Sequence, residues 1–319
     1  MKEKYIADLS PNDDVTEFYL LRESSIRTGS NNKQYLDLLI SDRTGELRGK
    51  KWDVSDEEAA ELATLGNGTI VKIRGLISEW NGAKQIKVQK IRALSENDQI
   101  DKSDFFKTAP EDTGDMFNFM IQKAESIKDQ DLSLLVKKIL TDNKEKFLYY
   151  PAAAKNHHAE FGGLLYHIKR MLINAEKMCE VYDILNRDLL VTGVILHDME
   201  KLNEMDSSKD GIVSEYTFEG MMLGHLVQGS VAIGRLCDEL NVPYEKKIML
   251  EHMMISHHYE PEWGSPRKPL FPEAEILHYL DMIDAKMYDF EDALSGVKPG
   301  EFSEKVWTLD NRKIYKRGW

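Results

Sequence analysis

The sequence predicts two domains of different structural class, a small β-barrel followed by an all-helical domain. Up to residue 95, apolar side chains alternate with polar ones, as in half-buried strands. From residue 110 onward they recur every three to four residues, as in amphipathic helices. A chain of 319 residues is also longer than one average domain, which favours the division.

The first domain contains the strands 34–42, 45–52, 69–80 and 83–94. In the third strand, Val71, Ile73 and Ile77 share one parity, the pattern of a strand with one buried face. The Asn81-Gly82 pair is a strong signal for a tight hairpin turn between the last two strands.

A short helix is predicted at 55–65, between the second and third of these strands. Ser55 is the expected N-cap, and Glu58 would complete a capping box. Strands, one helix and a closing hairpin within residues 1–95 are typical of an OB-type barrel.

OB barrels bind single strands by stacking bases on aromatic side chains beside a basic track. The candidates here are Tyr35, Trp52, Trp80, Lys50, Lys51, Lys72 and Arg74. The alternative is that the aromatic side chains belong to the core and the cations form a solvated face. That alternative is favoured for any single residue, whereas binding is favoured for the module as a whole.

Composition and helical periodicity divide the whole chain into four parts. Residues 1–95 form the OB-fold domain, 96–109 a polar linker, 110–300 a helical domain and 301–319 a basic and aromatic tail. The predicted helices are 112–128, 131–147, 162–182, 187–202, 218–240, 244–256 and 274–294, with a proline-rich loop at 261–272.

Composition limits the classes of function. The formal net charge of −13 falls on residues 96–319, since residues 1–95 balance 15 basic against 15 acidic side chains. A local basic groove remains compatible with this acidity, so nucleic-acid binding is not excluded. No stretch approaches the roughly 20 apolar residues of a membrane span, and the N-terminus is too polar for a secretory signal. We therefore expect a cytoplasmic protein without a membrane partner.

All nine histidines lie between residues 157 and 278, and several recur at helix ends. The resulting ordered set is His167, His197-Asp198, His225, His257-His258 and Asp281, with Asp284 one turn further on. One or two inward ligands on each helix is how helical bundles build metal sites. Imidazole and carboxylate ligands together suit Mn, Fe, Mg or Zn, and the lack of cysteine among them argues against a structural zinc.

Asp198 is adjacent to His197 and could bridge two metal ions, which together would activate water for attack on a phosphodiester. Lys201 lies three residues further on the same helix face and could neutralise a phosphate oxygen. A lone histidine is more often an ordinary core residue. Because the His-Asp pair occurs with four matching residues, a metal site is favoured over ordinary core residues here.

This ordered pattern resembles the HD-domain metal phosphohydrolase superfamily. The segments HHAEFGGLLYH (157–167), VILHDMEKL (194–202), GHLVQG (224–229), ISHHYEPEWGSP (255–266) and EAEILHYLDMIDAKM (273–287) resemble those of the YhaM-type 3′→5′ exoribonucleases. The resemblance covers nearly the whole chain, and it implies an N-terminal OB-fold joined to a C-terminal HD domain.

The resemblance also implies roles for single residues and a cofactor. His167, His197, Asp198 and Asp281 would hold a first metal, His225 and His257 with bridging Asp198 a second, and Lys201 would contact the scissile phosphate. His158, His252, His258 and Asp284 are candidates for supporting positions behind the ligands. The implied cofactor is a pair of Mn²⁺ ions, with Mg²⁺ or Fe as alternatives.

We therefore expect a metal-dependent 3′→5′ exoribonuclease that hydrolyses single-stranded RNA to 5′-mononucleotides by metal-activated water, with single-stranded DNA as a further candidate substrate. One alternative is an HD-type phosphohydrolase of nucleotides or cyclic dinucleotides, and another is an RNA-binding adaptor without activity. A homo-oligomer is expected. The methionines of the helical domain are assigned to its core rather than to an interface: Met221, Met222, Met249, Met253 and Met254.

Overall fold

The computed structural model describes residues 2–29, 33–62, 65–66, 68–80, 83–95, 97–101, 104–154, 158–208, 211 and 213–319. These residues divide into two compact units, Met1–Thr108 and Ala109–Trp319. Each unit has a hydrophobic core of its own.

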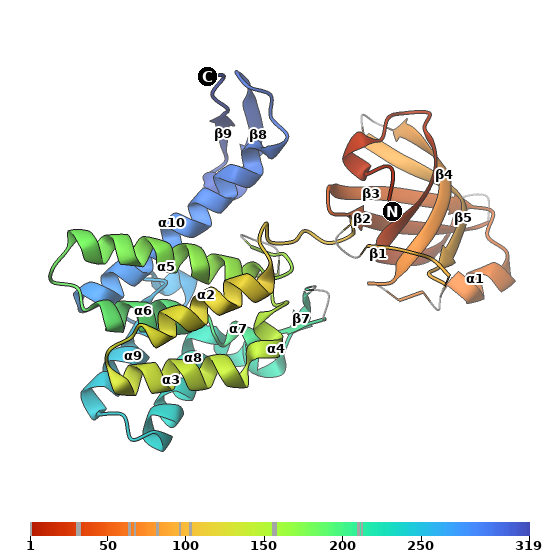
Figure 1. Ribbon diagram of the computed structural model, residues 1–319. Coiled ribbons are helices and arrows are strands. Elements are labelled where there is room, and N and C mark those ends of the chain that lie inside the picture. Colours follow the sequence, from red (N-terminus) through yellow and green to blue (C-terminus); the bar gives the residue numbers. More distant parts are fainter. Residues whose placement is uncertain are drawn as a thin grey trace. The chain divides into compact units, whose positions relative to one another are not determined.

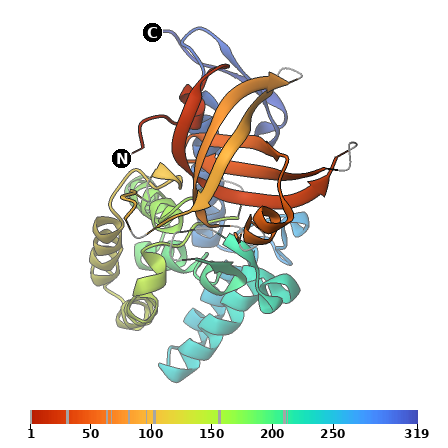
Figure 2. The ribbon, with the colours of Figure 1, turned by 90° about the vertical axis from the view of Figure 1, so that its right-hand side faces the viewer.

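Unit 1 is a closed five-stranded barrel with the strand order β1-β2-β3-β5-β4 (Figures 1 and 2). Its elements are η1 (Ile6–Asp8), β1 (Asp14–Thr28), β2 (Gln34–Asp42), β3 (Gly45–Trp52), α1 (Asp56–Leu62), β4 (Ile70–Trp80) and β5 (Ala83–Ala93). Neighbouring strands are antiparallel except for β3 and β5, which run parallel with Gly49 opposite Ile86. The predicted OB-fold is confirmed.

The predicted strand pattern holds where alternation is regular. Val71, Ile73 and Ile77 are fully buried inside the barrel. Trp80 of β4 pairs with Ala83 of β5, so the predicted hairpin forms, although Asn81-Gly82 itself lies outside the described residues.

Strand β1 is the element of the barrel that the sequence does not predict. Its successive residues Tyr19, Leu20 and Leu21 are all buried, and its pairing with β2 shifts register between Leu21 and Glu23. A bulge of this kind interrupts the two-residue period by which strands are recognised in a sequence.

Two connections in unit 1 refine the predicted boundaries. Ser55 Oγ accepts a hydrogen bond from Glu58 N, as expected of an N-cap, while the Glu58 carboxylate pairs with Lys51. Residues 63–64, at the predicted end of this helix, lie outside the described part. Within the predicted linker, Phe105 and Phe106 are buried and Asp104 accepts a hydrogen bond from Tyr5, so its second half packs against unit 1.

Unit 2 is a helical domain built around α6. Its helices are α2 (Thr113–Glu125), α3 (Gln130–Asp142), α4 (Lys144–Phe147), α5 (Gly163–Val181), α6 (Arg187–Leu196), α7 (Lys201–Glu204), α8 (Phe218–Glu239), α9 (Tyr244–Ser256) and α10 (Pro272–Ser295). Every residue of α6 from Leu189 to Leu196 is buried, because α2, α3, α5, α9 and α10 surround it (Figure 1). Gly193 allows close packing, since a Cβ there would collide with the Met253 side chain of α9.

The predicted helix 187–202 ends early, at Leu196. The side chain of His197 turns back so that Nδ1 lies 2.9 Å from the Val194 carbonyl oxygen, the acceptor that Asp198 N would use in a continued helix. The chain then follows a tight turn, with Lys201 N donating to Asp198 O, before the single turn of α7.

Short strands interrupt the otherwise helical unit. β6 (Met205–Ser207) pairs with β7 (Val213–Tyr216), and β8 (Phe302–Val306) pairs with β9 (Arg312–Tyr315) around η4 (Trp307–Leu309). A further 3-10 turn, η3, spans Pro261–Trp263. The predicted tail is therefore a hairpin, and the predicted helix 131–147 divides into α3 and α4.

The methionines of α8 and α9 differ in their surroundings. Met253 and Met254 are buried as predicted, whereas Met221 and Met222 are exposed, so the assignment of these two to the core is wrong. Across the described chain, no helix combines the length and the apolarity that crossing a bilayer requires.

Candidate metal centre and nucleic-acid face

The carboxylate of Asp198 lies at the meeting point of four imidazoles. Its Oδ2 is 3.3 Å from His197 Nε2 and 3.7 Å from His167 Nε2. Its Oδ1 is 3.4 Å from His225 Nε2 and 4.0 Å from His257 Nε2. One buried carboxylate thus presents a different oxygen to each pair of histidines.

Asp281 and Lys201 complete this cluster. Asp281 Oδ1 lies 3.4 Å from His167 Nε2, and Lys201 Nζ lies 2.8 Å from Asp198 Oδ2. The structure therefore brings together all six residues predicted as metal ligands, although they come from α5, the turn after α6, α8, the end of α9 and α10.

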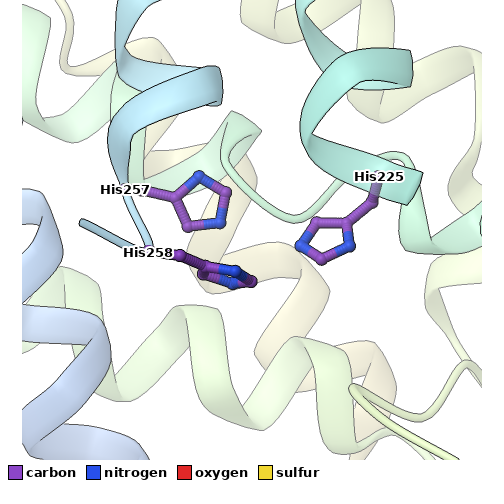
Figure 3. Close-up of side chains that lie close together, drawn as sticks. All are labelled: His225, His257 and His258. Carbon is purple, nitrogen blue, oxygen red and sulfur yellow. The ribbon is translucent and has the colours of Figure 1, made fainter. Parts of the chain in front are cut away.

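From the sequence, His258 is predicted to occupy a supporting position behind the ligands. In the structure it lies within the cluster. Figure 3 shows its ring gathered with those of His225 and His257. The His258 ring centroid is 4.4 Å from that of His257 and 5.1 Å from that of His225. Its Nδ1 lies 2.8 Å from the Trp263 carbonyl oxygen, which leaves Nε2 for the cluster.

The donor atoms fit divalent metal ions. Among the described residues, three sets have potential ligand atoms within 4.8 Å of one another. Two of them surround Asp198, namely His167, His197 and Asp198, and His225, His257 and His258, and the third is His158, His167 and Asp284. Among the described residues, Asp198 Oδ1, His225 Nε2 and His257 Nε2 are buried without a hydrogen-bond partner. Since buried polar atoms are rarely left unsatisfied, cations that suit imidazole and carboxylate would supply the missing interactions.

The other ring nitrogen of each of the four imidazoles around Asp198 is already engaged. His197 Nδ1 and His257 Nδ1 lie 2.9 and 2.8 Å from the carbonyl oxygen three residues earlier, at Val194 and Met254. His167 Nδ1 lies 2.8 Å from Asp284 Oδ2. Such contacts fix the tautomer and the ring orientation of a metal-binding histidine.

Glu204 performs the same task for His225 and is not among the predicted residues. The Glu204 carboxylate lies 3.0 Å from His225 Nδ1, and its Oε1 accepts a hydrogen bond from His225 N. Gly224 kinks α8 with φ 68° and ψ 160°, a conformation essentially restricted to glycine, and so directs His225 toward the cluster. The glycine before His225 is the feature of the sequence that could have indicated this kink. No feature of the sequence indicates the role of Glu204, because its contact with His225 depends on the turn after α6.

The remaining supporting candidates separate into two groups. Asp284 Oδ2 lies 2.8 Å from both His158 Nε2 and His167 Nδ1, and its other oxygen pairs with Arg170, as expected of a supporting carboxylate. His252 differs, because its Nε2 accepts a hydrogen bond from Leu270 N and its ring packs against Phe271. Within the described chain, these contacts of His252 are with residues outside the cluster.

Burial and neighbouring charges shift the pKa values of the predicted ligands in different directions. Burial acts to raise the pKa of Asp198, but Lys201 and His197 outweigh it and hold that pKa well below its usual value. Burial, with His258 and His197 nearby, lowers the pKa of His257 well below its usual value, so this imidazole is neutral. For His167, burial acts to lower the pKa, but hydrogen bonds to Asp281 and Asp284 raise it to about 10.

The structure brings together only some of the barrel residues that are predicted to contact nucleic acid. The rings of Tyr35 and Trp52 lie 4.7 Å apart, and Lys50 Nζ lies 5.3 Å and 5.6 Å from their centroids. A groove of about 460 Å³ adjoins them, with Lys50, Trp52 and Lys87 in its wall. This arrangement combines exposed aromatic surface with positive charge, as single-strand binding requires.

The other predicted contacts lie elsewhere. Lys51 is buried and paired with Glu58, because its strand parity points it inward, so it is not part of the exposed groove. Lys72 and Arg74 line a separate hollow on β4. The side chain of Trp80 lies outside the described residues.

Comparison with known proteins gives two family matches. Residues 22–94 match the OB-fold nucleic acid binding domain, and residues 164–286 match the HD domain.

Similar solved structures include the second OB-fold domain of replication protein A from Methanococcus maripaludis, at 22% identity over 32% of this chain and 100% of that chain, with a TM-score of 0.24. A crystal structure of a domain of the same protein is 25% identical over 28% of this chain and 93% of that chain, with a TM-score of 0.25. The replication factor A related protein from Methanobacterium thermoautotrophicum is 19% identical over 31% of this chain and 96% of that chain, with a TM-score of 0.24.

The HD domain indicates a metal-dependent phosphohydrolase, and the OB-fold indicates nucleic-acid binding. The chain therefore joins an N-terminal OB-fold to a C-terminal HD domain.

Proposed function

We propose that this protein is a metal-dependent 3′→5′ exonuclease that shortens single-stranded RNA, and also single-stranded DNA, to 5′-mononucleotides. The observation that carries the proposal is the position of Asp198, whose two carboxylate oxygens face two different histidine groups. A carboxylate shared in this way could hold two ions close together, and two neighbouring ions can act jointly on one phosphodiester.

In this proposal His167, His197, Asp198 and Asp281 would hold one ion, and His225, His257 and His258, together with Asp198, would hold the other. Bound Mn²⁺, Mg²⁺ or Fe ions would polarise the phosphodiester and lower the pKa of water. Lys201 places a positive charge beside Asp198, where it can bind a phosphate oxygen. Glu204 and Asp284 hold His225 and His167 in the required orientation.

In this proposal, unit 1 binds the single-stranded nucleic acid. The Tyr35–Trp52 pair offers aromatic surface on which bases can stack, and Lys50 adds a cation for the backbone. Stacking of this kind tolerates any base, which suits an enzyme that removes nucleotides one after another.

Replacement of Asp198 tests the proposal. We expect Asp198→Ala to lose both ions and to slow the release of mononucleotides from a 5′-labelled oligoribonucleotide by at least about a hundredfold, the scale of a lost electrostatic contact to a transition state. Asp238→Ala is the matched control, because Asp238 is exposed and pairs with Lys247 at the surface. Trimming by Asp198→Ala at the control rate would refute the proposal.

A second candidate is hydrolysis of nucleotides or cyclic dinucleotides. A cavity of about 370 Å³ beside the cluster, lined by Lys201, His258 and Asp281 among others, favours it. This volume lies within the range of small-molecule sites. The two candidates differ in their need for unit 1.

A further inference from the structure

The cavity beside the cluster extends away from the metal ligands along one helix. Lys201, His258 and Asp281 line its end at the cluster, and Trp263, Trp307 and Thr308 also line it. Between them lie Ala285 and Asp289, which follow Asp281 at intervals of four residues and so share one face of α10. At 1.5 Å per residue, Asp281 and Asp289 are separated by about 12 Å along the helix.

Two tryptophans in this wall present large aromatic surfaces to solvent. The exposed fractions are 52% for Trp263 and 69% for Trp307. Aromatic side chains of this size are normally largely buried. Within the described chain, neither indole is paired with another ring. Trp263 is also tied to the cluster, since its carbonyl oxygen lies 2.8 Å from His258 Nδ1.

Trp307 is held in place by the hairpin that carries it. The next residue, Thr308, accepts a hydrogen bond at its carbonyl oxygen from Lys286 Nζ of α10, at 2.8 Å. Leu309 is fully buried, and Lys316 Nζ of the same hairpin binds the carbonyl oxygen of Leu294. The C-terminal hairpin therefore forms a fixed wall of the cavity.

We propose that this cavity binds the terminal nucleoside of the substrate, with its base stacked on the indoles of Trp263 and Trp307 and its 5′-phosphate at the cluster. The assignment deepens the function proposed above and rests on it. Asp281 lies at the phosphate end and the hairpin at the base end, so a 5′-mononucleotide product would fill the same space. Stacking on an indole accepts purines and pyrimidines alike.

A binding experiment tests the assignment without turnover. Calorimetric titration of the full chain with 5′-AMP and with 5′-UMP, in Mg²⁺, should show about tenfold weaker binding in Trp263→Ala and Trp307→Ala, the scale of one lost base stack. Trp307→Phe should recover most of the affinity for both nucleotides. Trp319→Ala is the matched control, since Trp319 is 94% exposed in the same C-terminal segment and does not line the cavity. Unchanged affinity in both cavity variants would overturn the assignment, and circular dichroism of each variant checks that it folds.

A kinetic experiment separates this assignment from the function on which it rests. Wild-type protein should remove an ordinary 3′ nucleotide about tenfold more efficiently than an abasic one, and Trp307→Ala should lose that preference. If the wild type trims RNA but Trp307→Ala keeps the preference, the assignment fails and the proposed function stands. If the wild type trims no RNA, the proposed function fails, and the mononucleotide titration still decides whether the cavity is a nucleoside site.

Discussion

His167 lies between two carboxylates, with Asp281 on its Nε2 side and Asp284 at its Nδ1. In the protein without metal, these contacts outweigh burial and raise the pKa of His167 to about 10. A metal ligand must present a free lone pair, so a cation that binds Nε2 displaces a proton. Below pH 10, proton and metal therefore compete, and metal affinity at this site should increase as the pH rises.

This competition predicts proton release on metal binding. Titration of Mn²⁺ into metal-free protein at pH 7, in two buffers of different ionisation enthalpy, should show release of about one proton for the ion at His167. Asp284→Asn removes one of the two stabilising carboxylates, so it should lower the pKa of His167 and reduce the release. Heats that do not depend on the buffer would contradict a protonated His167.

At the scale of single elements, α8 depends on the kink at Gly224. An alanine at φ 68° and ψ 160° is strained by about 1–3 kcal/mol. We therefore expect Gly224→Ala to lower the free energy of unfolding by this amount, measured by urea denaturation. It should also lower metal content, because His225 would no longer reach Asp198.

Gly229→Ala is the matched control on the same helix. Its Cβ would meet only ordinary contacts with Met254, and its backbone is helical. Alanine is favoured over glycine inside a helix by roughly 0.5–1 kcal/mol, so this variant should be as stable as the wild type or slightly more stable. Equal stability and metal content in both variants would show that the kink does not position His225.

The elements also show what the sequence can and cannot predict. Regular periodicity is sufficient for β4, whose Val71, Ile73 and Ile77 fill the barrel, whereas α6 is recognised as a continuous apolar run, because it is buried on all sides. Strand β1 is not predicted because three consecutive buried residues, followed directly by a bulge, interrupt the expected alternation. The end of α6 was missed because a side chain, that of His197, takes the next backbone acceptor.

The candidate site was predictable to a similar extent. The ordered His and Asp residues are visible in the sequence, and the structure brings the six of them together. Glu204 and His258 join the site through the turn after α6 and the loop that ends at Trp263, which no local periodicity encodes. Lys51 was misplaced because the parity of a short strand leaves its buried face ambiguous.

At the scale of the whole molecule, each unit has a separate core, so the contribution of unit 1 can be measured by its removal. We expect residues 109–319 alone to hydrolyse a short phosphodiester at the full-length rate. The same fragment should lose affinity for long single-stranded RNA by roughly tenfold or more for each base stack lost. Gel-shift and steady-state assays on RNAs of increasing length measure both effects.

Substitutions in the full chain provide the control for this truncation. Trp52→Ala should reproduce part of the loss on long RNA while leaving short substrates unaffected, because Trp52 lies on the groove of unit 1. An enzyme of cyclic dinucleotides would behave differently. It would show no dependence on RNA length in either form, whereas the proposed exonuclease loses affinity for long RNA when unit 1 is removed.

The cluster draws its ligands from residue 167 to residue 281, on helices far apart along the chain. A partly synthesised or partly folded chain cannot assemble it, because Asp281 joins only after α10 has docked. Ions bound there would stabilise only the finished fold, so their binding energy is also folding energy for unit 2. Under the proposed function, full hydrolytic activity therefore requires that unit 2 has folded as far as α10.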